Sequence, residues 1–297
     1  MVYGGKLGNV ISLAITCAVI ALGADSASRI PQHAYKTGET VHFVFENTDT
    51  RYASAPGLAG VRAGGLQTME EIKVNVKLEA VDLKDGVTKK VTLTDVVYRQ
   101  QSADDIRAGK SANYSRAVDL IPNFPREFTY IYHVAKNDGE VESSLAGFFK
   151  GFLNNPVATF LYYKLQDFHA FLGSGDTVAL KGLTVGQSVL SNEMAIPLEH
   201  GTFRNAQMLT TYNAYATREG IPQGDFNSMV MGNVYDMPDP APQIETNYQY
   251  SYTAAAAGKY AGLPLHGKMT ETIYSTEKSS RAVTIIQRMV SVTLLTR

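Results

Sequence analysis

The residues of this chain that could do chemistry do not form a recognisable catalytic or metal-binding motif. The six histidines stand at positions 33, 42, 133, 169, 200 and 266. No two of them have the spacing of paired metal ligands. His200 lies in the polar stretch 198–202, which a hydrolase site would explain and which a turn with an exposed histidine explains more simply. A hydrolase centred near His200 is therefore kept only as an alternative.

Acidic residues give no stronger signal. Glu70 and Glu71 are adjacent, as are Asp104 and Asp105, but both pairs lie in solvated stretches. Asp95 falls on the apolar side of a strand pattern, which favours a bulge or a strand end over a catalytic carboxylate. No GxSxG, Walker A or GxGxxG run occurs. We predict no catalytic residue, no metal site and no cofactor, and an enzyme is the less favoured interpretation.

Aromatic residues are better candidates for a binding site. Tyr248, Tyr250 and Tyr252 alternate with polar residues, so their rings share one strand face and could stack a sugar or another ring ligand. An aromatic strand face also serves as ordinary core. Together with Phe160, Leu161 and Phe168 of an apolar helix, these tyrosines are the predicted ligand-binding residues.

Period-two patterns predict the strands that would position these side chains. The clearest runs from 71 to 80, where Ile72, Val74, Val76 and Leu78 alternate with charged or polar residues. Similar patterns occur at 41–45, 91–97, 128–134, 208–216, 226–231, 248–252, 268–275 and 281–295. The Gly- and Ala-rich stretch 52–68 is predicted to be a long loop.

One apolar helix interrupts the strands, over about residues 143–172. Ser143 or Ser144 is the expected N-cap, Asn155-Pro156 forms a second helix start, and Gly173 and Gly175 are expected to end the pattern. A helix that is apolar on most of its circumference is enclosed by protein or lies against a membrane. Lys164 and its polar neighbours argue against a spanning helix. We therefore predict a mainly β (α+β) fold, an antiparallel sheet or β-barrel-like structure packed around this helix.

Composition restricts the classes of function. Of the 297 residues, 27 are basic and 28 acidic, and no basic stretch occurs, so the attraction that drives nucleic-acid binding is missing. No repeat or linker is evident, which predicts one β-rich domain over residues 29–297.

The first 28 residues read as a signal peptide. Lys6 precedes an apolar run of 13 residues, 11–23, and small residues follow it. This run is shorter than the roughly 20 residues of a membrane-spanning helix. We therefore expect a secreted or periplasmic protein without a spanning helix in its mature part. The single cysteine, Cys17, lies inside the run, so the mature chain would contain no disulfide.

The order of the predicted elements resembles the N-terminal module of the large lipid transfer proteins, the vitellogenins and the microsomal triglyceride transfer protein. The likeness is carried by the stretches 35–38, 64–66, 128–141, 160–171 and 285–295. The resemblance implies a β-barrel wrapped around a central helix. The family's cysteines and its lipid-cavity sheets are missing here, so it implies docking of a partner or of a small apolar ligand.

We therefore expect an exported, non-enzymatic protein that binds an apolar or lipid-like ligand or a protein partner. The alternative from another class is a structural or surface-assembly protein that forms by pairing of edge strands. An outer-membrane barrel is disfavoured because several strand faces carry Lys and Glu where lipid would lie.

Overall fold

The computed structural model of the chain describes residues 29–31, 33–54, 65–82, 88–134, 141–143, 145–177, 183–198, 201–231, 243–276 and 283–296. The first strands are β1 (Thr40–Ser54), β2 (Leu66–Asp82), β3 (Thr88–Ser102), β4 (Ser115–Arg116), β5 (Glu127–Val134) and β6 (Val141–Ser143). The others are β7 (Ser188–Leu198), β8 (Gly201–Arg218), β9 (Ile221–Met231), β10 (Gln243–Ala255), β11 (Pro264–Thr276) and β12 (Val283–Leu294). The helices are α1 (Ala103–Arg107), α2 (Ala117–Leu120), α3 (Leu145–Phe149) and α4 (Pro156–Thr177).

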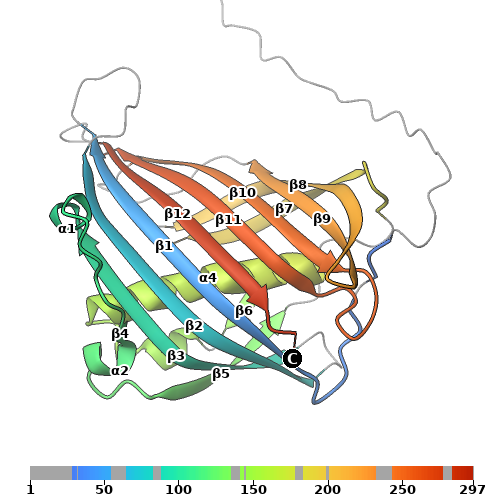
Figure 1. The fold of residues 1–297 in the computed structure, drawn as a ribbon, viewed down its shortest axis with the longest axis horizontal. Helices are drawn as coiled ribbons and strands as arrows, with labels where there is room; N and C mark the ends of the chain where they lie inside the picture. Colours follow the sequence, from blue (N-terminus) through green and yellow to red (C-terminus); the bar gives the residue numbers. More distant parts are fainter. Residues whose placement is uncertain are drawn as a thin grey trace, which may run out of the picture.

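The strands form one antiparallel sheet in the order β6-β5-β3-β2-β1-β12-β11-β10-β9-β8-β7, and β4 pairs with part of β3. The first and last strands, β1 and β12, pair in the middle of this sheet over twelve residues. Figure 1 shows the sheet as a curved layer with α4 crossing its concave side. The predicted fold class, an antiparallel sheet around an apolar helix, is confirmed.

Alternation along β2 explains how the sheet obtains two different faces. Ile72, Val74, Val76 and Leu78 are at most 1% exposed and form part of the inner, concave face. Their neighbours, which include Glu71 and Lys73, point outward. Because side chains alternate across a strand, every paired neighbour repeats this division, and the fold has an apolar inside and a polar outside.

Of the two alternatives predicted for Asp95, a bulge or a strand end, the structure shows the bulge. Asp95 has a positive φ of 52°, and the β2–β3 register shifts between Lys73 and Asn75. Asn75 Nδ2 donates a hydrogen bond of 2.8 Å to the Asp95 carboxylate. Because of the extra residue, odd-numbered residues such as Leu93 point inward before the bulge, and even-numbered residues such as Val96 point inward after it. The strand therefore keeps apolar residues inside on both sides of the bulge.

The predicted helix is divided in two, which corrects the single segment 143–172. Ser143 ends β6, and the other predicted cap, Ser144, lies outside the described residues. The helix α3 ends at Phe149, where a tight turn begins. The second start is confirmed: Asn155 Oδ1 accepts the backbone N–H of Val157 at 2.9 Å, and Pro156 is the first helical residue. The helix continues through Gly173 and Gly175 to Thr177, because glycine weakens a helix without preventing it.

The core lies between α4 and the concave face of the sheet. Leu161, Leu165 and Phe168 are at most 1% exposed, which confirms the enclosed helix. The Phe168 ring meets Phe45 edge-on at 5.3 Å between ring centroids. In the described residues no helix is long and apolar enough to cross a membrane.

Two sequence predictions fall at or beyond the limits of the described residues. The predicted loop 52–68 is shorter at both ends, because β1 continues to Ser54 and β2 begins at Leu66. Its middle, residues 55–64, and the predicted signal peptide, residues 1–28, lie outside the described residues.

Candidate functional site

Four charged side chains meet in the interior where α4 crosses the central strands. They are Asp49 of β1, Lys164 of α4, Glu271 of β11 and Arg288 of β12, and each is at most 2% exposed. Asp49 Oδ2 accepts a hydrogen bond of 2.7 Å from Lys164 Nζ, and Asp49 Oδ1 accepts one of 3.1 Å from Arg288 Nε. Arg288 Nη1 donates a further bond of 2.9 Å to Glu271. We refer to these four residues as the ionic quartet.

Among the described residues, the ionic quartet contributes two carboxylates and two cations. Burial alone would raise the pKa of Asp49, but the positive charges of Lys164 and Arg288 outweigh it and lower this pKa from 3.8 to about 2. Asp49 therefore stays ionised at any physiological pH. A carboxylate held in this state is a poor proton acceptor, so the geometry favours a structural role that fixes α4 against β1 and β12.

Three predicted ligand-binding residues are in the same interior. Leu161 and Phe168 are fully buried against the sheet, and the Phe160 ring packs on Tyr98 at 5.8 Å between centroids. Lys164 Nζ lies 5.0 Å from the centroid of the Phe160 ring. These side chains fill the space between helix and sheet, and their role as ligand contacts stays a prediction.

The predicted tyrosines lie on β10. Tyr252 belongs to a stack of inward rings, in which the Tyr212 ring centroid lies 4.4 Å from that of Phe226, and the Phe226 centroid lies 5.1 Å from that of Tyr252. Gly224 makes room for this stack, since a Cβ there would be 2.7 Å from the Tyr212 ring. Tyr250 is 5% exposed, and the side chain of Tyr248 is outside the described part of the structure. For these residues too, ligand binding stays a prediction.

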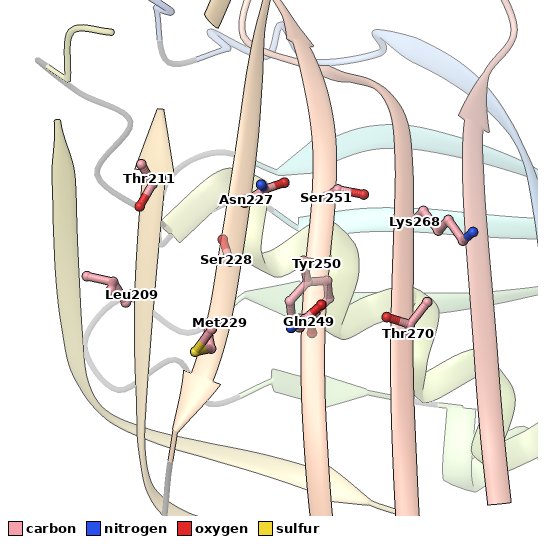
Figure 2. A pocket seen from close by; sticks show the side chains of 10 residues that line it. All are labelled: Leu209, Thr211, Asn227, Ser228, Met229, Gln249, Tyr250, Ser251, Lys268 and Thr270. Carbon is pink, nitrogen blue, oxygen red and sulfur yellow. The ribbon is translucent and has the colours of Figure 1, made fainter. Parts of the chain in front are cut away.

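The outer face of β8, β9, β10 and β11 contains a hollow of about 390 Å³, which we call the outer hollow. Two adjacent rows of outward side chains form it, each crossing all four strands (Figure 2). One row is Leu209, Met229, Gln249 and Thr270. The other is Thr211, Asn227, Ser251 and Lys268. Ser228 and Tyr250, both buried, complete the lining.

The outward side chains that line the outer hollow are almost uncharged, and they expose both polar and apolar surface. Lys268 is its only ionisable outward side chain among the residues that line it. Met229 is 46% exposed, so an apolar surface also faces solvent here. Within the described ranges, no side chain or backbone group makes a hydrogen bond to the side chains of Asn227, Gln249 or Ser251. These groups are therefore available to a bound molecule.

A second hollow, of about 300 Å³, lies over β1, β2, β3 and β5. His42, Lys77, Lys90 and Glu127 are among the residues that line it. Charges of both signs occur there, and Lys77 Nζ is 3.9 Å from the Glu79 carboxylate. A mixed lining of this kind does not select one class of ligand.

The other polar residues considered from the sequence have structural partners or lie outside the described part. Glu71 forms an ion pair with Arg99, and the Tyr98 hydroxyl donates a hydrogen bond of 2.8 Å to Glu70. Asp105 accepts from Ser102 at the start of α1. His200 lies outside the described residues, so the hydrolase alternative stays untested. In the part of the chain that the structure describes, no three His, Cys, Asp or Glu residues are grouped as metal ligands.

Sequence reasoning missed both the ionic quartet and the outer hollow. The quartet has a signal, since Asp49, Glu271 and Arg288 are charged residues at inward positions of strands whose inward residues are mostly apolar. The residues of the outer hollow carry no comparable signal, because neutral polar residues are normal on any solvated strand face.

Comparison with known proteins gives no family for this chain: no family model and no curated protein matches it. Among solved structures, it is similar to an outer membrane channel from Pseudomonas putida F1, with 9% identity and a TM-score of 0.27. That likeness covers 91% of this chain and 99% of the channel. It is also similar to a putative exported protein with a YmcC-like fold from Bacteroides fragilis, with 8% identity, a TM-score of 0.20 and coverages of 87% and 96%. At these TM-scores neither likeness bears on function, and the resemblance to lipid transfer proteins stays a prediction.

Proposed function

We propose that the protein is an exported, non-enzymatic binding protein that holds its partner on the outer face of β8–β11. The outer hollow is the observation that carries this proposal. It has a volume within the range of small-molecule sites, and the side chains of Asn227, Gln249 and Ser251 bond no other group in the described part of the chain. Export rests on the apolar run 11–23 behind Lys6.

The interior is less suitable as a binding site. The members of the ionic quartet bond one another, and Leu161 and Phe168 are fully buried. An apolar ligand would enter this space only if α4 moved out and the buried pair Asp49–Lys164 separated. Separation of such a pair costs several kcal/mol, which favours the outer hollow over an enclosed apolar site.

Native mass spectrometry of the protein purified from its own source tests this function. We expect a copurifying molecule or partner that is lost in Ser251→Trp, because a Trp side chain there fills the outer hollow. The control is Lys73→Trp. Lys73 lies in the same outward row as Ser251 but four strands away, on β2. At a strand spacing of about 4.8 Å, the two positions are about 19 Å apart. A bound molecule that survives Ser251→Trp but is lost in Phe168→Ala would instead indicate the enclosed apolar ligand.

A second candidate function, assembly by strand pairing, is favoured by the edge strand β7. Its Leu190 is 46% exposed and continues an outward apolar row with Leu209 and Met229. An edge strand with an apolar side chain next to it can pair with another chain. Sedimentation over a range of concentrations tests this, with Leu190→Lys as the variant expected to abolish any association. A wild-type protein that stays monomeric at every concentration removes the candidate.

A further inference from the structure

The outer hollow selects a particular hydrogen-bonding chemistry. Asn227 and Gln249 each offer two donors and a carbonyl acceptor, while Ser251 and Thr270 offer hydroxyls that both donate and accept. The Thr211 hydroxyl shares a hydrogen bond of 2.8 Å with the Ser188 hydroxyl. None of the outward lining residues is acidic. Such a surface complements a ligand whose own groups donate and accept at once, which is the property of sugar hydroxyls.

The shape of the outer hollow indicates how an extended ligand would lie in it. Its two rows run perpendicular to the strands, from β8 to β11, over about 14 Å at the usual spacing of about 4.8 Å between strands. The apolar members of the first row, Leu209 and Met229, stand together at the β8–β9 end, and Lys268 stands at the β11 end (Figure 2). An extended ligand that lies along the rows therefore meets an apolar surface, then amides and hydroxyls, then one positive charge.

Other ligand classes fit less well. Apolar ligands occupy pockets lined mainly by apolar side chains, and here only Leu209 and Met229 are aliphatic. Nucleic acids require several basic residues along the phosphates, and this hollow has one. The centres of protein interfaces are enriched in aromatic residues and Arg and depleted of Ser, which differs from this lining.

We propose that the outer hollow binds a short saccharide chain. Leu209 and Met229 cover the C–H face of one sugar ring, Asn227 and Gln249 bind hydroxyls in the middle, and Lys268 binds an acidic substituent at the β11 end. This inference rests on the proposed function, because it names the ligand class of the same site.

Calorimetric titration of the purified protein tests the ligand class. The probes are cellohexaose, maltohexaose, mannohexaose, chitohexaose and an oligogalacturonate. We expect at least one to bind, and Asn227→Ala and Gln249→Ala each to weaken it about 2- to 10-fold, the loss of one neutral hydrogen bond. Gln287→Ala, which removes an exposed outward amide on β12, is the matched control and leaves affinity unchanged. Lys268→Ala weakens the oligogalacturonate more than the neutral probes.

Two results overturn the proposal. One is the absence of binding by every probe up to about 10 mM, a range that detects a Kd of about 1 mM. The other is binding that Asn227→Ala and Gln249→Ala do not change. If a lipid or protein copurifies from the native source and is lost in Ser251→Trp, the saccharide class is wrong and the binding function stands. If no copurifying molecule is lost in Ser251→Trp, the proposed binding function is wrong as well.

Discussion

The ionic quartet and the outer hollow are both polar regions of the same sheet, but they differ in how their groups are satisfied. Inside, Asp49 accepts from both Lys164 and Arg288, and Arg288 also bonds Glu271. Outside, Asn227 and Gln249 bond no other group in the part of the chain that the structure describes. Buried polar groups that bond one another stabilise a particular packing, whereas exposed groups without a protein partner can exchange solvent for a ligand. The comparison therefore separates a structural site from a binding site.

The largest effect is expected when the quartet is unbalanced. Asp49→Asn leaves Lys164 and Arg288 facing one carboxylate in a buried site, so we expect a loss of about 3–5 kcal/mol of unfolding free energy. Adding Lys164→Met restores neutrality and should recover much of that loss. Denaturant unfolding of both variants measures this. A single variant within about 1 kcal/mol of wild type would show that the quartet has no structural importance.

The apolar contacts of α4 are expected to have the next largest effect. Leu165→Ala and Phe168→Ala each remove a buried side chain, which typically costs about 2–5 kcal/mol. The same unfolding measurement applies. If both variants lose less than about 1 kcal/mol, α4 is not part of the core, and the interior becomes a candidate for ligand binding.

Acid should weaken the interior through Asp49. Its pKa is lower in the folded protein, at about 2, than the ordinary value of 3.8, so ionised Asp49 stabilises the fold above pH 4. This stability, about 2 kcal/mol, is lost as the pH falls from about 4 to about 2. Unfolding free energies at several pH values should show this dependence in wild type. An Asp49→Asn variant with the same pH dependence would assign it to other groups.

The smallest effect on stability is expected in the outer hollow. Asn227→Ala and Gln249→Ala remove exposed side chains that the fold does not use, so unfolding free energy should change by less than about 0.5 kcal/mol. Thermal or denaturant unfolding is sufficient to check this. A loss above about 1.5 kcal/mol would mean that these amides are structural and would remove the contrast with the quartet.

Local patterns were enough to predict most of the fold. The alternation around Val74 and Val76, the bulge at Asp95 and the cap at Asn155 depend on neighbours in sequence, and the structure confirms each. The sequence predicted one helix where the structure has α3 and α4, because apolar residues recur at helical spacing on both sides of the break. Helical spacing shows which side of a helix is buried, but it does not show where a turn divides two helices.

The candidate sites required tertiary information. Asp49 and Arg288 are 239 residues apart, and only the pairing of β1 with β12 brings them together. From the sequence, Lys164 served only as an argument against a spanning helix, and its burial follows from the position of α4, which crosses the sheet at Asp49. The outer hollow depends on the register of four strands, which no single segment determines.

The central pairing of β1 with β12 has a consequence for how the chain reaches its native state. The strands β1, β2 and β3 pair in chain order, and so do β7 to β12, so each set contains hairpins that form locally. The two sets are joined by the pairing of β1 with β12, which ends where the Leu295 N–H donates to the His42 carbonyl. This pairing brings together the two ends of a loop that contains most of the chain. Closure of such a long loop is slow. The complete sheet, the quartet included, therefore cannot form before the last strand is available, although the hairpins within each set can form earlier.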